Sequence, residues 1–139
     1  MNKILIILFI ILAAIIALSV YMWSGFGSQI IGAKSFEMFL TVGDKIGFNI
    51  DTNAVYFGKT LPDSAAKRDL LISNDFNEKV LVAVEKSGDL AGWVEPSQND
   101  FYLNAKESKT ITLTATVPAD AKKSDYFGVV TVYYIKAHN

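Results

Sequence analysis

An uninterrupted apolar run near the N-terminus constrains this chain more than any other feature. The run, ILIILFIILAAIIALSVYMW, covers residues 4–23, contains no charged side chain, and carries hydroxyl groups only at Ser19 and Tyr21. Twenty residues of α-helix rise about 30 Å, which matches the hydrocarbon thickness of a bilayer. A helix on a soluble protein would show a polar stripe, and this run has none. We therefore predict that residues 1–23 form an N-terminal transmembrane helix that contacts the lipid bilayer through residues 4–23.

The residues that flank the run predict how the helix is placed. Lys3 precedes it, whereas Tyr21 and Trp23 lie at its far end, where aromatic side chains favour the membrane interface. We assign Lys3, Tyr21 and Trp23 to the membrane interfaces. No positive charge follows the helix before Lys34, so the positive-inside rule places the N-terminus in the cytoplasm. We expect a single-pass protein of the cell membrane with an extracytoplasmic C-terminal domain.

A cleaved signal peptide is the alternative interpretation of the same segment. Ala17-Leu18-Ser19 supplies the small residues of a cleavage site, and cleavage near Ser19 would release a secreted domain. The apolar run continues past this site to Trp23, which favours the uncleaved anchor. A secreted domain would suit the binding of carbohydrate or another surface ligand.

The pattern of the sequence changes after the apolar run. Residues 24–35 are rich in Gly and Ser and predict a short flexible linker. From residue 36 onward, apolar and polar residues alternate in short runs that Gly, Pro, Asn, Asp and Ser separate. This alternation is typical of β-strands. The runs cover residues 36–42, 46–50, 66–73, 80–84, 110–117 and 126–135. We therefore predict that residues 36–139 form an all-β domain, an antiparallel β-sandwich.

The charge balance excludes one class of partner and narrows the cellular context. Beyond the anchor the chain has 12 basic against 14 acidic side chains, and therefore a formal net charge of −2. With no basic stripe, nucleic-acid binding is not expected. The chain has no cysteine, so the extracytoplasmic domain must be stable without disulfides. This composition favours a prokaryotic source, archaeal or bacterial.

No combination of residues in the sequence predicts catalysis. The single histidine, His138, lies next to the C-terminal residue, and there is no cysteine to complete a transition-metal site or a nucleophilic pair. The acidic stretches 51–53 and 74–78 have the composition of polar turns and lack the spacing of a calcium loop. The glycines are scattered singly, so no phosphate loop is present. We expect no enzyme activity, no metal, no cofactor and no small-molecule substrate.

The aromatic residues provide the candidate binding surface. Trp93 follows a glycine and is expected to fill the core, with an exposed binding role as the alternative. The last predicted strand is apolar on both faces. We assign the face that contains Gly128 to the core, because a glycine allows close sheet packing. Neighbouring strands or a partner protein must then cover the opposite face. This candidate interaction surface consists of Phe127, Val129, Tyr133 and Ile135.

Several motifs resemble those of prokaryotic immunoglobulin-like modules. Phe57-Gly58 is followed by a turn at Pro62-Asp63 and by an apolar strand that ends at Asn74. The second half has a Trp, a Phe-x-Leu, a Val-Pro and a Tyr-x-Gly. These matches are Trp93, Phe101, Leu103, Val117, Pro118, Tyr126 and Gly128. The resemblance covers residues 54–136 and implies an immunoglobulin-like β-sandwich. The glycine that commonly precedes the Tyr is absent, because Lys123-Ser124-Asp125 stands there.

The layout of one membrane helix and one outward β-sandwich is also similar to that of the archaellum stator proteins of archaea. Those proteins bind the S-layer and anchor a rotating filament. The resemblance implies a non-catalytic, membrane-tethered module that works through protein contacts or self-association. Such a module would serve as a subunit of a cell-envelope or filament assembly.

Overall fold

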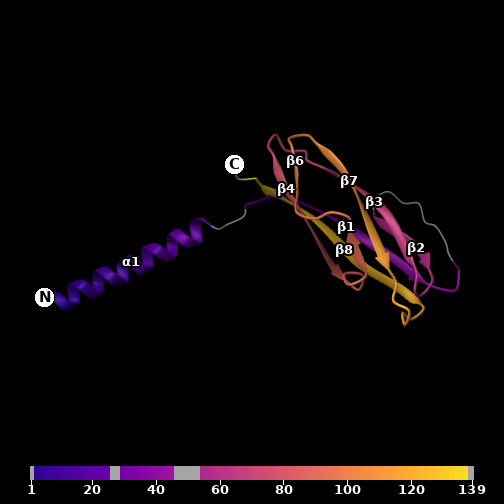
Figure 1. Ribbon diagram of the computed structural model, residues 1–139, viewed down its shortest axis with the longest axis horizontal. Coiled ribbons are helices and arrows are strands. Elements are labelled where there is room, and N and C mark those ends of the chain that lie inside the picture. Colours follow the sequence, from indigo (N-terminus) through magenta and orange to yellow (C-terminus); the bar gives the residue numbers. More distant parts are fainter. Residues whose placement is uncertain (1, 26–28, 46–53, 138–139) are drawn as a thin grey trace.

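A computed structural model describes residues 2–25, 29–45 and 54–137, with the side chains of residues 22–25 excepted. Helix α1 (Lys3–Gly25) projects away from the β-domain in Figure 1. The strands of the described residues are β1 (Ile30–Val42), β2 (Val55–Thr60), β3 (Ala65–Ser73), β4 (Val80–Gly88), β5 (Val94–Pro96), β6 (Phe101–Leu103), β7 (Ser108–Thr116) and β8 (Ser124–Lys136).

The strands form two sheets that share one hydrophobic core. The five-stranded sheet has the order β2-β1-β8-β4-β6, and the three-stranded sheet has the order β3-β7-β5. Because successive side chains of a strand point to opposite faces, alternate residues of each strand enter the core. Both sheets contribute fully buried side chains, among them Met38, Leu40, Val82, Ile111, Leu113, Val130 and Val132. The prediction of an N-terminal apolar helix followed by an all-β domain is therefore confirmed.

Strands β1 and β8 form the longest pair in the domain. Their antiparallel register runs from Ile30 opposite Ile135 to Val42 opposite Ser124. The predicted linker, residues 24–35, is therefore too long. Helix α1 ends at Gly25 and β1 begins at Ile30, because residues 30–35 pair with the end of β8 in spite of their glycine and serine.

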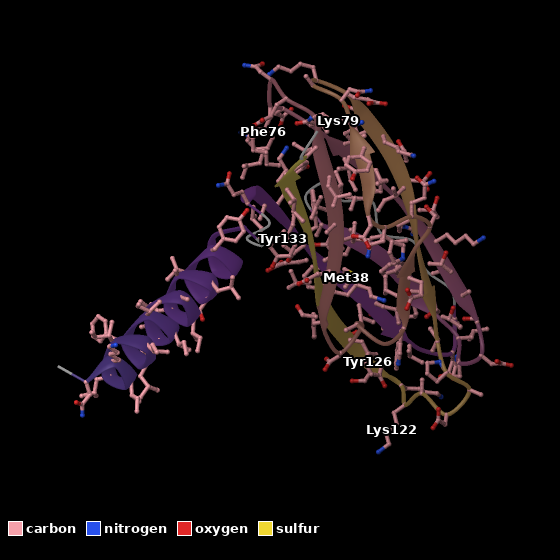
Figure 2. The ribbon with its side chains drawn as sticks, turned by 60° about the vertical axis from the view of Figure 1, so that its left-hand side comes forward. Met38, Phe76, Lys79, Lys122, Tyr126 and Tyr133 are labelled. Atoms are coloured by element: carbon pink, nitrogen blue, oxygen red, sulfur yellow. The ribbon has the colours of Figure 1, made fainter. Side chains whose placement is uncertain are left out.

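The end of the domain where β1 begins and β8 ends is called the proximal end below, and the opposite end is called the distal end. Figure 2 labels Phe76 and Lys79 near the proximal end and Tyr126 and Lys122 at the distal end.

Strand β2 runs parallel to β1, so the expected wholly antiparallel arrangement is wrong for this pair. Strand β2 starts beside the middle of β1, where Val55 lies opposite Met38, and runs in the same direction. The register shifts between Phe39 and Leu40, which leaves Phe57 as the extra residue of a bulge. Phe57 is buried, and Gly58 adopts a φ of 83° there.

Asn74 connects three segments at the proximal end. Its side chain is 1% exposed, and its Nδ2 donates hydrogen bonds to the carbonyl oxygens of Glu78 and Asn104 at 2.8 Å and of Leu103 at 3.3 Å. Its Oδ1 accepts a hydrogen bond from the backbone N–H of Phe76 at 3.0 Å. The asparagine that ends β3 is therefore a structural residue. It satisfies backbone groups of Phe76, Glu78 and Asn104, which lie outside the strands.

Helix α1 meets the length and composition required to cross a membrane over Lys3–Tyr21, and none of this span is buried against the rest of the described chain. Of the predicted interface residues, Lys3 begins the helix and Tyr21 lies in its last turn, 78% exposed. The side chain of Trp23 lies outside the described part of the structure. The strand predicted at residues 46–50 lies outside it as well.

Candidate interaction surface

The four predicted surface residues of β8 all lie on the face of the five-stranded sheet that points away from the core. Phe127 is 52% exposed, and Val129, Tyr133 and Ile135 are half-buried. Neighbouring side chains cover them in part, since Tyr133 lies between Ala33 of β1 and Ala83 of β4. Figure 2 shows Tyr133 near the start of β1 and the end of α1. The cover that neighbouring strands provide is therefore incomplete, and cover by a partner protein stays a prediction.

An aromatic row extends this surface across three strands. The ring of Phe39 on β1 stacks on Tyr56 of β2 at a centroid distance of 4.9 Å. It meets Phe127 of β8 edge to face at 5.4 Å. The alternation of residues in β1 could have predicted Phe39 as part of this surface, because Phe39 lies on the face opposite Met38 and Leu40. Tyr56 could not be found in this way, because the pairing of β2 with β1 depends on the fold.

The apolar side chains on this outer face lie on both sides of a polar band. Ser35 and Thr131 lie opposite each other in this band, with 3.1 Å between Oγ and Oγ1, and Glu37 of β1 and Glu85 of β4 belong to it as well. Tyr133 and Ile135 lie on the proximal side of this pair, and Phe39 and Phe127 lie on the distal side. We call the set the outer-face patch: Ala33, Phe39, Tyr56, Leu81, Ala83, Phe127, Val129, Tyr133 and Ile135.

Trp93 does not fill the core, contrary to the expectation. It is half-buried at the edge of the core, where its ring lies 4.5 Å from that of Tyr126. The core positions of this segment belong to Leu90 and Val94, both with 0% exposure. The residues between Gly88 and Val94 form a tight turn, with the N–H groups of Trp93 and Val94 both donating to Leu90 O. This turn directs the smaller side chains inward and leaves the indole at the edge.

Ion pairs at the proximal end account for the acidic turn 74–78. Asp75 accepts a hydrogen bond from Lys34 Nζ at 2.8 Å, and Glu78 pairs with Lys136 at 3.4 Å. The hydrogen bond from Lys34 lowers the pKa of Asp75, and the same contact raises the pKa of Lys34. Burial raises the pKa of the neighbouring Tyr134. Because its carboxylates engage lysines, this turn acts as a structural element.

Within the residues that the structure describes, no three His, Cys, Asp or Glu side chains gather in a way that could hold a metal ion. His138 and the turn at residues 51–53 lie outside those residues. Comparison of the chain with protein-family models, curated proteins and solved structures gave no match.

Proposed function

We propose that this chain is a membrane-tethered, non-catalytic module of immunoglobulin-like fold that binds a partner protein through the outer-face patch. The α1 helix holds the module at the outer side of the cell membrane. The patch contacts another subunit of a cell-envelope or filament assembly. The observation that carries this proposal is the row of apolar side chains on a sheet face that the rest of the described chain leaves partly uncovered.

The arrangement of strands supports the immunoglobulin-like part of the proposal. In that fold the second strand pairs with the fifth and the fifth with the fourth, while the third and sixth pair in the other sheet. Counted from β3 as the second strand, the β3-β7-β5 sheet and the β4–β8 pair follow this scheme if β6 is left out of the count. The scheme places a seventh strand beside the sixth. Here that place beside β8 is taken by β1, which is the first strand of the domain in sequence.

The chemistry of α1 supports the tether. A helix of 23 residues measures about 35 Å, enough to cross the hydrocarbon core and reach the headgroups. Lys3 is the only charged side chain in the helix, and the apolar side chains of residues 4–21 are exposed on every side of the helix. Exposing this surface to water is unfavourable by about 25 cal/mol for each Å², so the helix requires an apolar environment.

The patch supports protein binding because its composition differs from that of an ordinary solvated sheet face. An antiparallel sheet with one face in water usually carries polar side chains on that face. Here the central strand β8 presents four apolar side chains outward, together with one threonine and, near its start, Asp125. Contiguous exposed apolar groups on a soluble domain mark interaction sites.

The test compares two lysine substitutions in the full-length protein in its native membrane. Tyr133→Lys places a charge in the patch. Leu71→Lys is the matched control, because Leu71 is 62% exposed on β3 of the other sheet. Chemical crosslinking before mild solubilisation should trap a complex with wild type and with Leu71→Lys, and much less of it with Tyr133→Lys. Circular dichroism and melting should show both variants folded.

Two results would refute parts of the proposal separately. If Tyr133→Lys folds and crosslinks as well as wild type, the patch is not the interface. If the protein leaves the membrane in alkaline carbonate, the tether is wrong. A mature protein that lacks residues 1–19 would favour the alternative, a secreted domain that binds carbohydrate or another surface ligand. The small residues Ala17-Leu18-Ser19 are the feature that favours this alternative.

A further inference from the structure

A pocket opens at the distal part of the outer face because strand β4 is shorter than β8. The last pair between them joins Gly88 to Gly128, so within the described part of the chain residues 124–127 of β8 have β1 as their only sheet neighbour. Phe127 is therefore open on the side where β4 would continue. The resulting pocket has a volume of about 320 Å³ and is lined by Glu37, Met38, Phe39, Gly88, Asp89, Phe127, Gly128 and Val129.

Two glycines bring the backbones of β4 and β8 close together at this pocket. A Cβ on Gly128 would lie 2.8 Å from the carbonyl oxygen of Ser87, and one on Gly88 would lie 2.9 Å from the Cα of Gly128. The two backbones are therefore too close for any other residue at either position. This part of the pocket presents backbone alone, while Phe39 and Phe127 supply aromatic walls.

Two carboxylates line the same pocket without a partner. Glu37 and Asp89 are both exposed, and neither makes an ion pair or a side-chain hydrogen bond within the described residues. Several other acidic side chains of the domain are engaged: Asp44, Asp75, Glu78 and Glu95 pair with lysines, and Asp69 and Asp125 accept hydrogen bonds from threonines. Asp63, Glu85, Asp100 and Asp120 resemble Glu37 and Asp89 in lacking a side-chain partner within the described residues. Glu37 and Asp89 differ from these because they line a pocket beside the most exposed aromatic ring of the patch.

The combination of aromatic walls and free carboxylates selects one kind of ligand. An anion would be repelled, and a purely apolar group would remove water from two carboxylates without replacing their hydrogen bonds. A cation with an apolar stem satisfies both features, since the stem packs on the walls and the cation attracts the carboxylates and the ring faces. Arginine fits best, because its planar guanidinium stacks on aromatic rings and has enough donors for two carboxylates.

We propose that this pocket receives an arginine side chain of the partner protein, with Glu37 and Asp89 as acceptors and Phe127 as the stacking surface. The inference rests on the proposed function and adds the chemistry of the partner, which is a basic side chain among apolar neighbours. The formal net charge of −2 beyond the anchor also attracts a basic partner.

The test uses the full chain, labelled with ¹⁵N, in detergent micelles. The probes are the peptide acetyl-Leu-Arg-Leu-amide and its citrulline counterpart, which has the same shape without the charge. We expect the arginine peptide to shift the amide signals of Gly88 and Gly128 in a saturable way, and the citrulline peptide to bind at least tenfold more weakly. The double variant Glu37→Gln/Asp89→Asn should weaken binding of the arginine peptide at least tenfold. Glu85→Gln, on β4 outside the pocket, should leave it unchanged.

Equal binding of the two peptides, or equal binding by wild type and the double variant, would overturn the proposal. So would the absence of saturable shifts with the arginine peptide at millimolar concentration. The neutral substitutions keep the shape of both side chains, and the remaining amide signals report whether the variant is folded. Tyr133 lies outside the pocket, so the crosslinking result with Tyr133→Lys tests the proposed function independently of these outcomes.

Discussion

Removal of the Asn74 side chain should be among the most damaging single changes in the β-domain. Asn74→Ala deprives the carbonyl groups of Glu78 and Asn104 of their 2.8 Å donors and leaves the N–H of Phe76 without its acceptor. Each such hydrogen bond contributes about 1 kcal/mol, and more where water cannot replace the lost group. Because Asn74 is 1% exposed, we expect a loss of about 3 to 4 kcal/mol in the free energy of unfolding.

Asn99 provides the matched control. Its side chain makes three hydrogen bonds, two to the backbone of Val84 and one to the N–H of Asp100, but the residue is exposed. Water can replace these bonds, so Asn99→Ala should cost about 1 kcal/mol or less. Asn74→Asp tests the donors alone, because it keeps the shape of the side chain and replaces the amide NH₂ with an acceptor. At neutral pH it should be at least as damaging as Asn74→Ala.

The assay is urea unfolding of the full chain in micelles, followed by the fluorescence of Trp93 in a Trp23→Phe background. A decrease of about 3 kcal/mol also corresponds to a fall in the melting temperature of more than about 10 °C for a domain of this size. If Asn74→Ala and Asn99→Ala shift the urea midpoint equally, burial does not determine how much these hydrogen bonds contribute to the free energy of unfolding. The reasoning about Asn74 would then be refuted.

Three further predictions concern other parts of the domain. Gly128→Ala should destabilise it by about 1 to 3 kcal/mol through overpacking, whereas Gly92→Ala, with no atom within 4 Å of the added Cβ, should leave the urea midpoint unchanged. Trp93→Ala should cost about 2 kcal/mol in urea unfolding followed by circular dichroism, since this variant lacks the fluorescent probe, and a double-mutant cycle with Tyr126→Ala should give a coupling of about 1 kcal/mol; a coupling of zero would contradict the ring contact. Burial raises the folded-state pKa of Tyr134 above 10.0, so the unfolded chain releases this proton first. Stability should be intact below about pH 10 and fall as the pH rises further, and Tyr134→Phe should reduce the fall in urea midpoint between pH 8 and pH 11.

Local patterns in the sequence predicted the elements whose side chains alternate or remain uniformly apolar. The threonine-rich run became β7, and the residues of β8 face as the position of Gly128 indicated, with Val130 and Val132 buried and Phe127 exposed. These features could be read because each depends on burial of one side of a single segment.

Features that depend on two distant segments could not be read from local patterns. Residues 30–35 have a linker composition, yet they form a strand because they pair with the end of β8, with one register shift between Ile30 and Gly32. The parallel β1–β2 pair and the contact of Phe39 with Tyr56 depend on the register that the bulge at Phe57 sets. The pocket exists because β4 stops at Gly88 while β8 continues. No periodicity within either segment records this difference in length.

The connection between α1 and β1 is short, and this limits how far the β-domain can move from α1 to contact a partner. Four residues separate Gly25 from Ile30, which allows a reach of about 17 Å at full extension. With α1 in the bilayer as proposed, each copy is confined to a thin layer at the membrane surface. Confinement of this kind raises the effective concentration of neighbours, up to the millimolar range for short tethers. A contact too weak to survive dilution could therefore hold an assembly together in the membrane, and solubilisation before crosslinking would destroy it.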